Sequence, residues 1–182
     1  FRRVLFRSVA FLQNVYDEKI FRPPYSLMTG FIGTAQISRA LSENGYADVA
    51  YKMLENNLYP SWLYPVTQGA TTIWERLNSY TKTEGFGGNN SMNSFNHYSF
   101  GAVGAWIFGN SLGIQRDENN PGWKKFILQP EPDFAGGITW AKGNYNSPYG
   151  VIESSWTLEN GGVTYNFKVP ANTTAKCKLP AS

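Results

Sequence analysis

The order of apolar and polar residues divides this chain into a helical region followed by a region of strands. Over residues 27–113 the apolar side chains recur every three or four positions, which is the spacing of one helix face. After Pro121 the apolar spacing changes to two, as in strands that bury one face. The pattern therefore predicts helices first and a sheet afterwards.

Three helices are predicted in the first region. One begins at Thr29 and ends at Asn44-Gly45, residue types that are typical of helix caps; its apolar face is expected to contain Phe31, Ala35, Ser38 and Leu41. The second helix covers residues 46–56, and the third covers residues 96–112 and is rich in Gly and Ala. Each helical Gly costs ~1 kcal/mol, so close packing must offset this cost. Such packing favours an all-helical barrel over a loose bundle.

Between the second and third helices, residues 58–93 follow neither spacing. Pro60, Pro65, Gly69 and the Gly- and Asn-rich run 85–90 predict long loops with short extended pieces. A stretch of this length without regular structure in a compact domain is usually functional. The chemistry is therefore expected in these loops.

Five strands are predicted after Pro121, separated by turns at residues 130–132, 147–148 and 160–162. They cover residues 123–128, 138–145, 151–158, 163–169 and 174–179. This arrangement predicts an antiparallel sheet region that forms a β-sandwich. The polar segment 113–121 is interpreted as a linker or surface loop between the two regions.

Composition removes several classes of function. Hydrophobic residues make up 42% of the chain and aromatic residues 16%, so the chain is expected to fold. The net charge of +3 is spread without a Lys/Arg cluster, which argues against a nucleic-acid partner. A single Cys and a single His predict no metal site and no disulfide, and we expect no cofactor. No apolar run is long enough to span a membrane.

The block SWLYPVTQGATTIWERLN at residues 61–78 combines aromatic residues with one acid, Glu75. An acid among aromatic side chains in a loop is a candidate catalytic group, and a nearby Arg76 guanidinium would keep it ionised, as a general base requires. An ordinary surface pair of Glu75 and Arg76 is the alternative. Trp62 and Trp74 in this block are candidate sugar-stacking residues, although such rings also fill cores.

A second block, SMNSFNHYSFGAVG at residues 91–104, places Asn96 and His97 at the start of the third helix. Their donors and acceptors suit the vicinal hydroxyl groups of a sugar. A His at a helix start is also a common capping or core hydrogen-bonding group. From the residues alone both interpretations stay open.

These blocks resemble the bacterial α-L-rhamnosidases of glycoside hydrolase family 78. The similar segments are TGFIGT at 29–34, PSWLYPVTQGATTIWERLN at 60–78, MNSFNHYSFGAVGAW at 92–106 and GWKKFILQPEPD at 122–133. The resemblance implies the C-terminal portion of an (α/α)6 barrel followed by a β-sandwich. It also implies that Glu75 is the general base and that His97 contacts rhamnose. Leu77-Asn78 stands where the family often has Trp-Asp.

We therefore expect part of an inverting hydrolase that removes terminal α-L-rhamnose from an oligosaccharide or glycoside. The family's general acid precedes the matched segments, so the chain alone is expected to be inactive. The expected division is a non-native junction at 1–8, barrel at 9–115 and sandwich at 116–182. The alternatives are another (α/α)6 glycosidase or phosphorylase, and a carbohydrate-binding sandwich that uses Trp123, Trp140, Tyr149 or Trp156 as stacking platforms.

Overall fold

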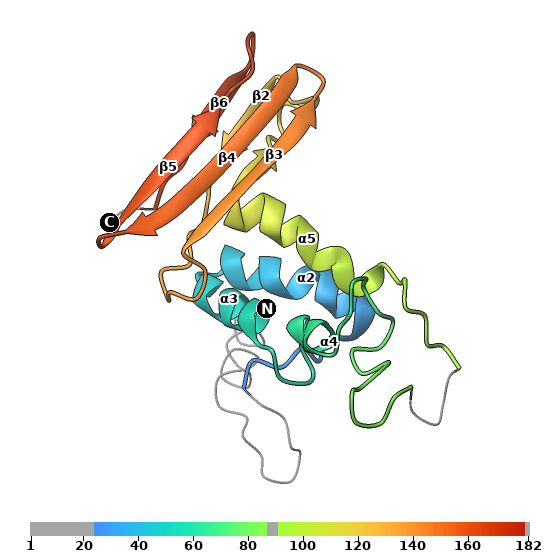
Figure 1. Ribbon diagram of the computed structural model, residues 1–182. Helices are drawn as coiled ribbons and strands as arrows, with labels where there is room; N and C mark the ends of the chain where they lie inside the picture. Colours follow the sequence, from blue (N-terminus) through green and yellow to red (C-terminus); the bar gives the residue numbers. More distant parts are fainter. Residues whose placement is uncertain (1–23, 87–90, 181–182) are drawn as a thin grey trace. The chain divides into compact units, whose positions relative to one another are not determined.

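The computed structural model describes residues 24–86 and 91–180, and the expected junction at 1–8 lies outside these ranges (Figure 1). The chain divides into two compact units between Val103 and Gly104. The first unit contains helices and long loops, and the second contains the strands. The change from helical to strand spacing in the sequence therefore corresponds to a change of secondary structure.

A helical hairpin forms the centre of the first unit. Helix α2 (Gly30–Glu43) and helix α3 (Ala47–Glu55) are joined by a short turn in which Gly45 has φ +83°, a conformation that favours glycine. The two helices pack through fully buried side chains, namely Leu41, Val49, Ala50 and Met53. Both predicted helices are confirmed, with their ends at the expected residues.

The buried face of α2 differs in part from the predicted one. Thr34 and Ser38 are buried together with Leu41, whereas Phe31 is 39% exposed and Ala35 is exposed. Burial of Thr34 is possible because its hydroxyl contacts both the Thr29 hydroxyl, at 2.9 Å, and the Gly30 carbonyl. A polar residue whose hydrogen bonds are satisfied can thus occupy a position that the apolar pattern assigns elsewhere.

The third predicted helix begins later than expected and changes its geometry along its length. It consists of the 3-10 turn η1 (Ser99–Ala102), α5 (Val103–Trp106) and the π-helical turn η2 (Ile107–Ser111). The predicted start at Asn96 is wrong because the preceding N–H groups bond outside the helix: that of Asn96 donates to Ser94 Oγ and that of His97 to the Ile73 carbonyl. The loop region before it contains one short helix that was not predicted, α4 (Leu63–Thr67).

Two three-stranded sheets form the second unit. Their strands are β1 (Ile114–Arg116), β2 (Lys125–Leu128), β3 (Trp140–Ser147), β4 (Gly150–Glu159), β5 (Gly162–Lys168) and β6 (Thr174–Cys177). One sheet has the order β1-β2-β6 and the other β3-β4-β5. All five predicted strands are present.

The predicted topology needs two corrections. Strand β1 lies within the segment that was interpreted as a linker. It was not predicted because only Ile114 of its three residues is buried, and so short a strand shows no alternation of apolar and polar residues. In addition, β2 pairs with β6 in the parallel sense, whereas every other strand pair is antiparallel in the part of the chain that the structure describes. A parallel pair joins strands that are distant in sequence, so local spacing does not reveal it.

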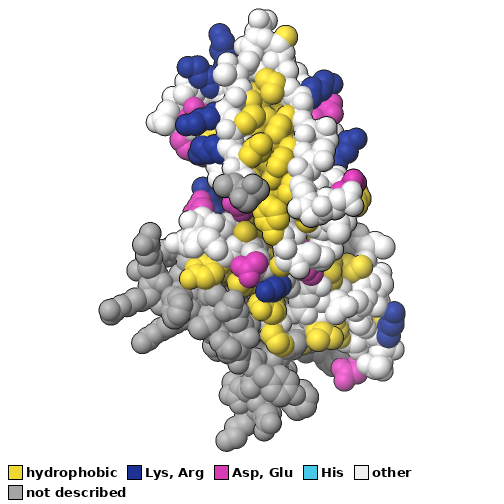
Figure 2. Space-filling model, turned by 90° about the vertical axis from the view of Figure 1, so that its left-hand side faces the viewer, with side chains coloured by type: hydrophobic (Ala, Val, Ile, Leu, Met, Phe, Trp, Pro, Cys, Tyr) yellow, Lys and Arg dark blue, Asp and Glu magenta, His cyan; other side chains and the backbone are white. Residues whose placement is uncertain are grey.

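The core of the second unit lies between the inner faces of the two sheets. It is built on five buried residues, Leu112, Ile114, Phe126, Leu128 and Ile152. Gly143 allows β3 to approach this core, since an added Cβ would lie 2.5 Å from Leu112 Cδ1. On the face shown in Figure 2, the charged side chains stand mainly on either side of a band of hydrophobic ones, without a large block of one sign. No described helix is long and apolar enough to cross a membrane.

Candidate functional site

The loop that carries Glu75 is hydrogen-bonded to the loop that carries His97. The N–H of Glu75 donates to the Ser94 carbonyl and the N–H of His97 donates to the Ile73 carbonyl, each at 2.8 Å. The Thr72 hydroxyl adds a third bond, to the carbonyl of Phe95. Residues 72–75 and 94–97 therefore lie side by side, so the fold brings together the two blocks from which the site was predicted.

One oxygen of the Glu75 carboxylate is held by this pairing. The N–H of Ser94 donates to Glu75 Oε2 at 2.8 Å. Across the described ranges the other oxygen, Oε1, has no hydrogen bond. A carboxylate held through one oxygen and open at the other is arranged to accept a proton from a water molecule.

The structure does not contain the expected pair between Glu75 and Arg76. Arg76 Nη2 donates to the Ser91 carbonyl at 2.6 Å, and no ion pair to Glu75 is found among the residues that are described. Arg76 thus fixes the start of the second loop. The interpretation of these two residues as an ordinary surface pair is wrong.

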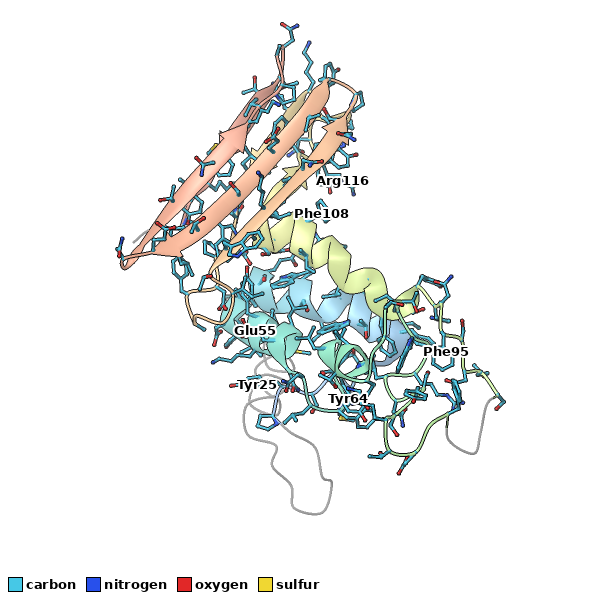
Figure 3. The ribbon with its side chains drawn as sticks, in the orientation of Figure 1. Tyr25, Glu55, Tyr64, Phe95, Phe108 and Arg116 are labelled. Carbon is cyan, nitrogen blue, oxygen red and sulfur yellow. The ribbon has the colours of Figure 1, made fainter. Side chains whose placement is uncertain are left out.

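Aromatic rings support the loops on both sides of Glu75. Trp74 is 6% exposed and meets Phe95 edge to face, with 5.2 Å between the ring centroids. Phe95, which Figure 3 labels, also meets Phe86 at 5.6 Å, and Phe86 meets Tyr80 at 5.2 Å. These contacts contribute to stability beyond buried area and limit movement of the loops.

Of the two ring nitrogens of His97, Nδ1 has a hydrogen bond and Nε2 has none to any described residue. Its Nδ1 accepts the N–H of Ser99 at 3.3 Å, so the neutral imidazole carries its proton on Nε2. The ring is stacked against Phe31, with centroids 4.9 Å apart, and against Tyr98, with centroids 5.4 Å apart. Nδ1 therefore caps the start of η1, as one of the two interpretations predicted, while Nε2–H remains able to donate to a ligand.

The other predicted site residues have different environments. Asn96 is exposed, and its side-chain amide has no partner within the described part of the chain. Trp62 is 9% exposed and its Nε1–H donates to the Phe100 carbonyl at 2.8 Å, so its indole nitrogen anchors η1. Trp74 is buried to a similar extent, at 6% exposure, and is adjacent to Glu75 in sequence.

Three further residues of this region, Ser94, Thr72 and Phe31, were not predicted from the sequence as site residues. Ser94 acts through its backbone N–H, which any residue except Pro provides, so its residue type gave no signal. Thr72 and Phe31 act on residues more than twenty positions away. Within 24–86 and 91–180, no group of three or more His, Cys, Asp or Glu side chains is placed to hold a metal ion.

Comparison with known proteins gives matches in both units. Residues 12–111 match the bacterial alpha-L-rhamnosidase 6 hairpin glycosidase domain, and residues 113–182 match the bacterial alpha-L-rhamnosidase C-terminal domain. An alpha-L-rhamnosidase from Formosa agariphila is 44% identical over 163 residues, and one from Streptomyces avermitilis is 38% identical over 157 residues. These alignments cover 90% and 86% of this chain but only 17% and 15% of the relatives' lengths.

Solved structures agree with these matches. The crystal structure of the Streptomyces avermitilis alpha-L-rhamnosidase in complex with L-rhamnose is similar with a TM-score of 0.77, covering 86% of this chain and 15% of that one. The enzyme from Aspergillus terreus gives the same TM-score at 36% identity, over 87% of this chain and 18% of that one. The helical unit thus corresponds to part of a six-hairpin barrel and the strands to a β-sandwich. With a family match over more than half of its length, the chain belongs to the bacterial α-L-rhamnosidases.

Proposed function

We propose that this chain forms part of an inverting hydrolase that removes terminal α-L-rhamnose from glycosides, with Glu75 as the general base. The observation that carries the proposal is the geometry of this carboxylate, which is held at Oε2 by the Ser94 N–H and open at Oε1. Membership of a glycoside hydrolase family supports the reaction class. The alignment covers 17% of that relative's length, which supports assigning the activity to a longer protein that contains this chain.

In the proposed reaction, a water oxygen bonds to the anomeric carbon of rhamnose while the glycosidic C–O bond breaks. Glu75 Oε1 takes one proton from that water. The leaving oxygen takes a proton from a carboxylic acid on the opposite side of the sugar, at ~6.5–9.5 Å from Glu75 in inverting enzymes. Attack from the opposite face releases β-L-rhamnose.

We assign the acid to residues outside this chain. Two described acids of the first unit, Glu43 and Asp48, form exposed ion pairs with Arg39 and Lys52 on helix surfaces, which is unsuitable for a proton donor. We accordingly propose that the 182-residue chain alone does not turn over rhamnosides.

Four residues are proposed to bind the sugar. His97 donates from Nε2 to a rhamnose hydroxyl, and its stacking against the Phe31 and Tyr98 rings holds the direction of this donor. Asn96, the preceding residue, supplies a side-chain amide that has no hydrogen bond to any described residue. Trp74 and Trp62 are proposed to shape the apolar wall of the subsite; because the Trp62 indole nitrogen is occupied, only its ring contributes.

The decisive experiment changes one atom of the base. In the enzyme that contains this chain, Glu75→Gln should lower kcat for an aryl α-L-rhamnoside by about 10²–10⁴-fold, the range that general base catalysis contributes. Glu84→Gln, in an exposed part of the same loop region, is the matched control and should leave kcat unchanged. Activity of Glu75→Gln within twofold of wild type would remove Glu75 from the mechanism.

Two further measurements test the finer parts of the proposal. Proton NMR of the first turnovers should show β-L-rhamnose before mutarotation, and α-L-rhamnose as the first product would exclude inversion. The isolated chain should release no aryl alcohol. Turnover by the isolated chain that is lost on Glu75→Gln would show that the acid lies within it after all.

A further inference from the structure

The β3-β4-β5 sheet has an outer face that differs sharply from its inner face. The inner face contains Ile152, Ser154 and Trp156, all buried, and Gly143 against Leu112. Because successive side chains of a strand point to opposite faces, Trp140 lies on the outer face. The register places it opposite Thr157, which in turn lies opposite Thr164. One row across three strands is therefore Trp-Thr-Thr.

Trp140 is 63% exposed, which is unusual for the largest side chain. No aromatic ring contacts it and its Nε1–H has no acceptor in the described ranges. The other candidate tryptophans of this unit pack within it. Trp156 is fully buried and its Nε1–H donates to the Ser111 carbonyl, and the centroid of the Trp123 ring lies 4.3 Å from that of Tyr145. Trp140 is thus not needed by the core.

The neighbours of Trp140 on this face are uncharged hydrogen-bonding groups. The adjacent row contains Ser155 opposite Asn166. The side chains of Thr157, Thr164, Ser155 and Asn166 form no hydrogen bond to any described residue. At the far end of the face, Lys168 and Glu153 neutralise each other in an ion pair of 3.0 Å. Lys142 lies opposite Ser155 at the β3 end of this adjacent row, and it is the one charged side chain among the six residues of the two rows.

We propose that this Trp140 surface, formed by Trp140, Thr157, Thr164, Ser155 and Asn166, binds a neutral saccharide at a site separate from the Glu75 site. A pyranose ring has an apolar face, which stacks on an indole, and a rim of hydroxyl groups, which pair with hydroxyl and amide side chains. Five of the six side chains in the two rows are uncharged, which favours a neutral ligand over an ionic one. Strands ~4.8 Å apart give the row a width of about 10 Å, enough for about two sugar rings.

This inference does not rest on the proposed catalytic function. The sequence predicted four aromatic residues as possible stacking platforms of a carbohydrate-binding sandwich. We assign this role to Trp140 alone.

The test uses the whole 182-residue chain with 15N-labelled tryptophan. The indole N–H signal of Trp140 is assigned through its loss in Trp140→Phe. Two neutral probes, methyl α-L-rhamnopyranoside and cellohexaose, are then titrated. We expect at least one probe to shift the Trp140 signal saturably, with Kd on the order of millimolar as befits a small contact.

Matched variants define the contact. Trp140→Ala should weaken binding at least about tenfold with no change in Tm, because the ring is exposed. Thr157→Val, which keeps the side-chain shape, should weaken it severalfold. Tyr149→Ala, at another exposed aromatic residue, and Glu75→Gln should bind as wild type does. The second of these separates the Trp140 surface from the proposed base.

Two results would overturn the proposal. One is an unshifted Trp140 signal with both probes up to 50-fold above the millimolar range, which would indicate that the ring is exposed for contact with protein. The other is wild-type affinity in Trp140→Ala, with shifts confined to the Trp62 and Trp74 signals. Such shifts would place the sugar in the helical unit and leave the sheet without a binding role.

Discussion

Ser154 offers a test of how the second unit is held together. Its hydroxyl lies on the inner face of β4 and donates to the Leu112 carbonyl at 2.6 Å, with both groups buried. Leu112 follows the π-helical turn η2, and the last carbonyls of a helix have no intrahelical donor. Ser154 therefore satisfies a buried acceptor at the end of this helix.

Ser154→Ala removes the donor and leaves the carbonyl of Leu112 unsatisfied in the core. An unpaired buried acceptor costs about 1–3 kcal/mol, and we expect the free energy of unfolding of this unit to fall by that amount. For a unit of this size the urea m-value is about 1 kcal/mol/M, so the midpoint should fall by about 1–3 M. Hydrogen exchange of peptides from β4, measured by mass spectrometry, distinguishes this unit from the helical one.

The adjacent residue provides the control. Ser155 has the same side chain but points to the outer face, where its hydroxyl has no partner among the described residues. Ser155→Ala should change the free energy of unfolding by less than about 0.5 kcal/mol. Equal midpoints for Ser154→Ala and Ser155→Ala would refute the reasoning, because they would show that the hydrogen bond to Leu112 does not stabilise the fold.

Three other predictions concern the site and one turn. His97→Asn keeps an acceptor for the first N–H groups of η1 but lacks Nε2, so it should raise KM about tenfold at unchanged Tm. A lower Tm with unchanged KM would show that His97 only caps η1. Thr72→Val removes the bond to the Phe95 carbonyl, and kcat should fall about tenfold through misplacement of the base, measured with an aryl rhamnoside. Gly161→Ala should destabilise the β4–β5 hairpin by about 1–2 kcal/mol in urea denaturation because its φ is +75°, whereas Gly162→Ala, without a positive φ, should cost less.

Local chemistry explains which parts of the fold could be predicted. The dipeptide Asn160-Gly161 specifies a two-residue hairpin turn, and both residues have positive φ, 51° and 75°. The end of α2 at Asn44-Gly45 was evident for the same reason. Strands β4 and β5 alternate over seven residues, so their spacing was unambiguous. Each of these features depends on neighbours within a few positions.

The remaining features depend on partners that are distant in sequence. Trp62 and Trp140 are the same residue type, yet one anchors η1 through Phe100 and the other stands on an open sheet face. Arg76 follows Glu75 directly but bonds to Ser91, because the path of the loop decides where a long side chain reaches. The positioning of Glu75 by a backbone N–H leaves no trace in residue types.

The pairing of residues 72–75 with 94–97 has a consequence for how such enzymes diversify. Both ends of the intervening loop are fastened next to the base, so the loop can lengthen or shorten without moving Glu75. Doubling a loop's length costs only about 0.6 kcal/mol in closure entropy. Selection, natural or in the laboratory, can thus vary the length and residues of this loop while the Glu75 carboxylate keeps its position.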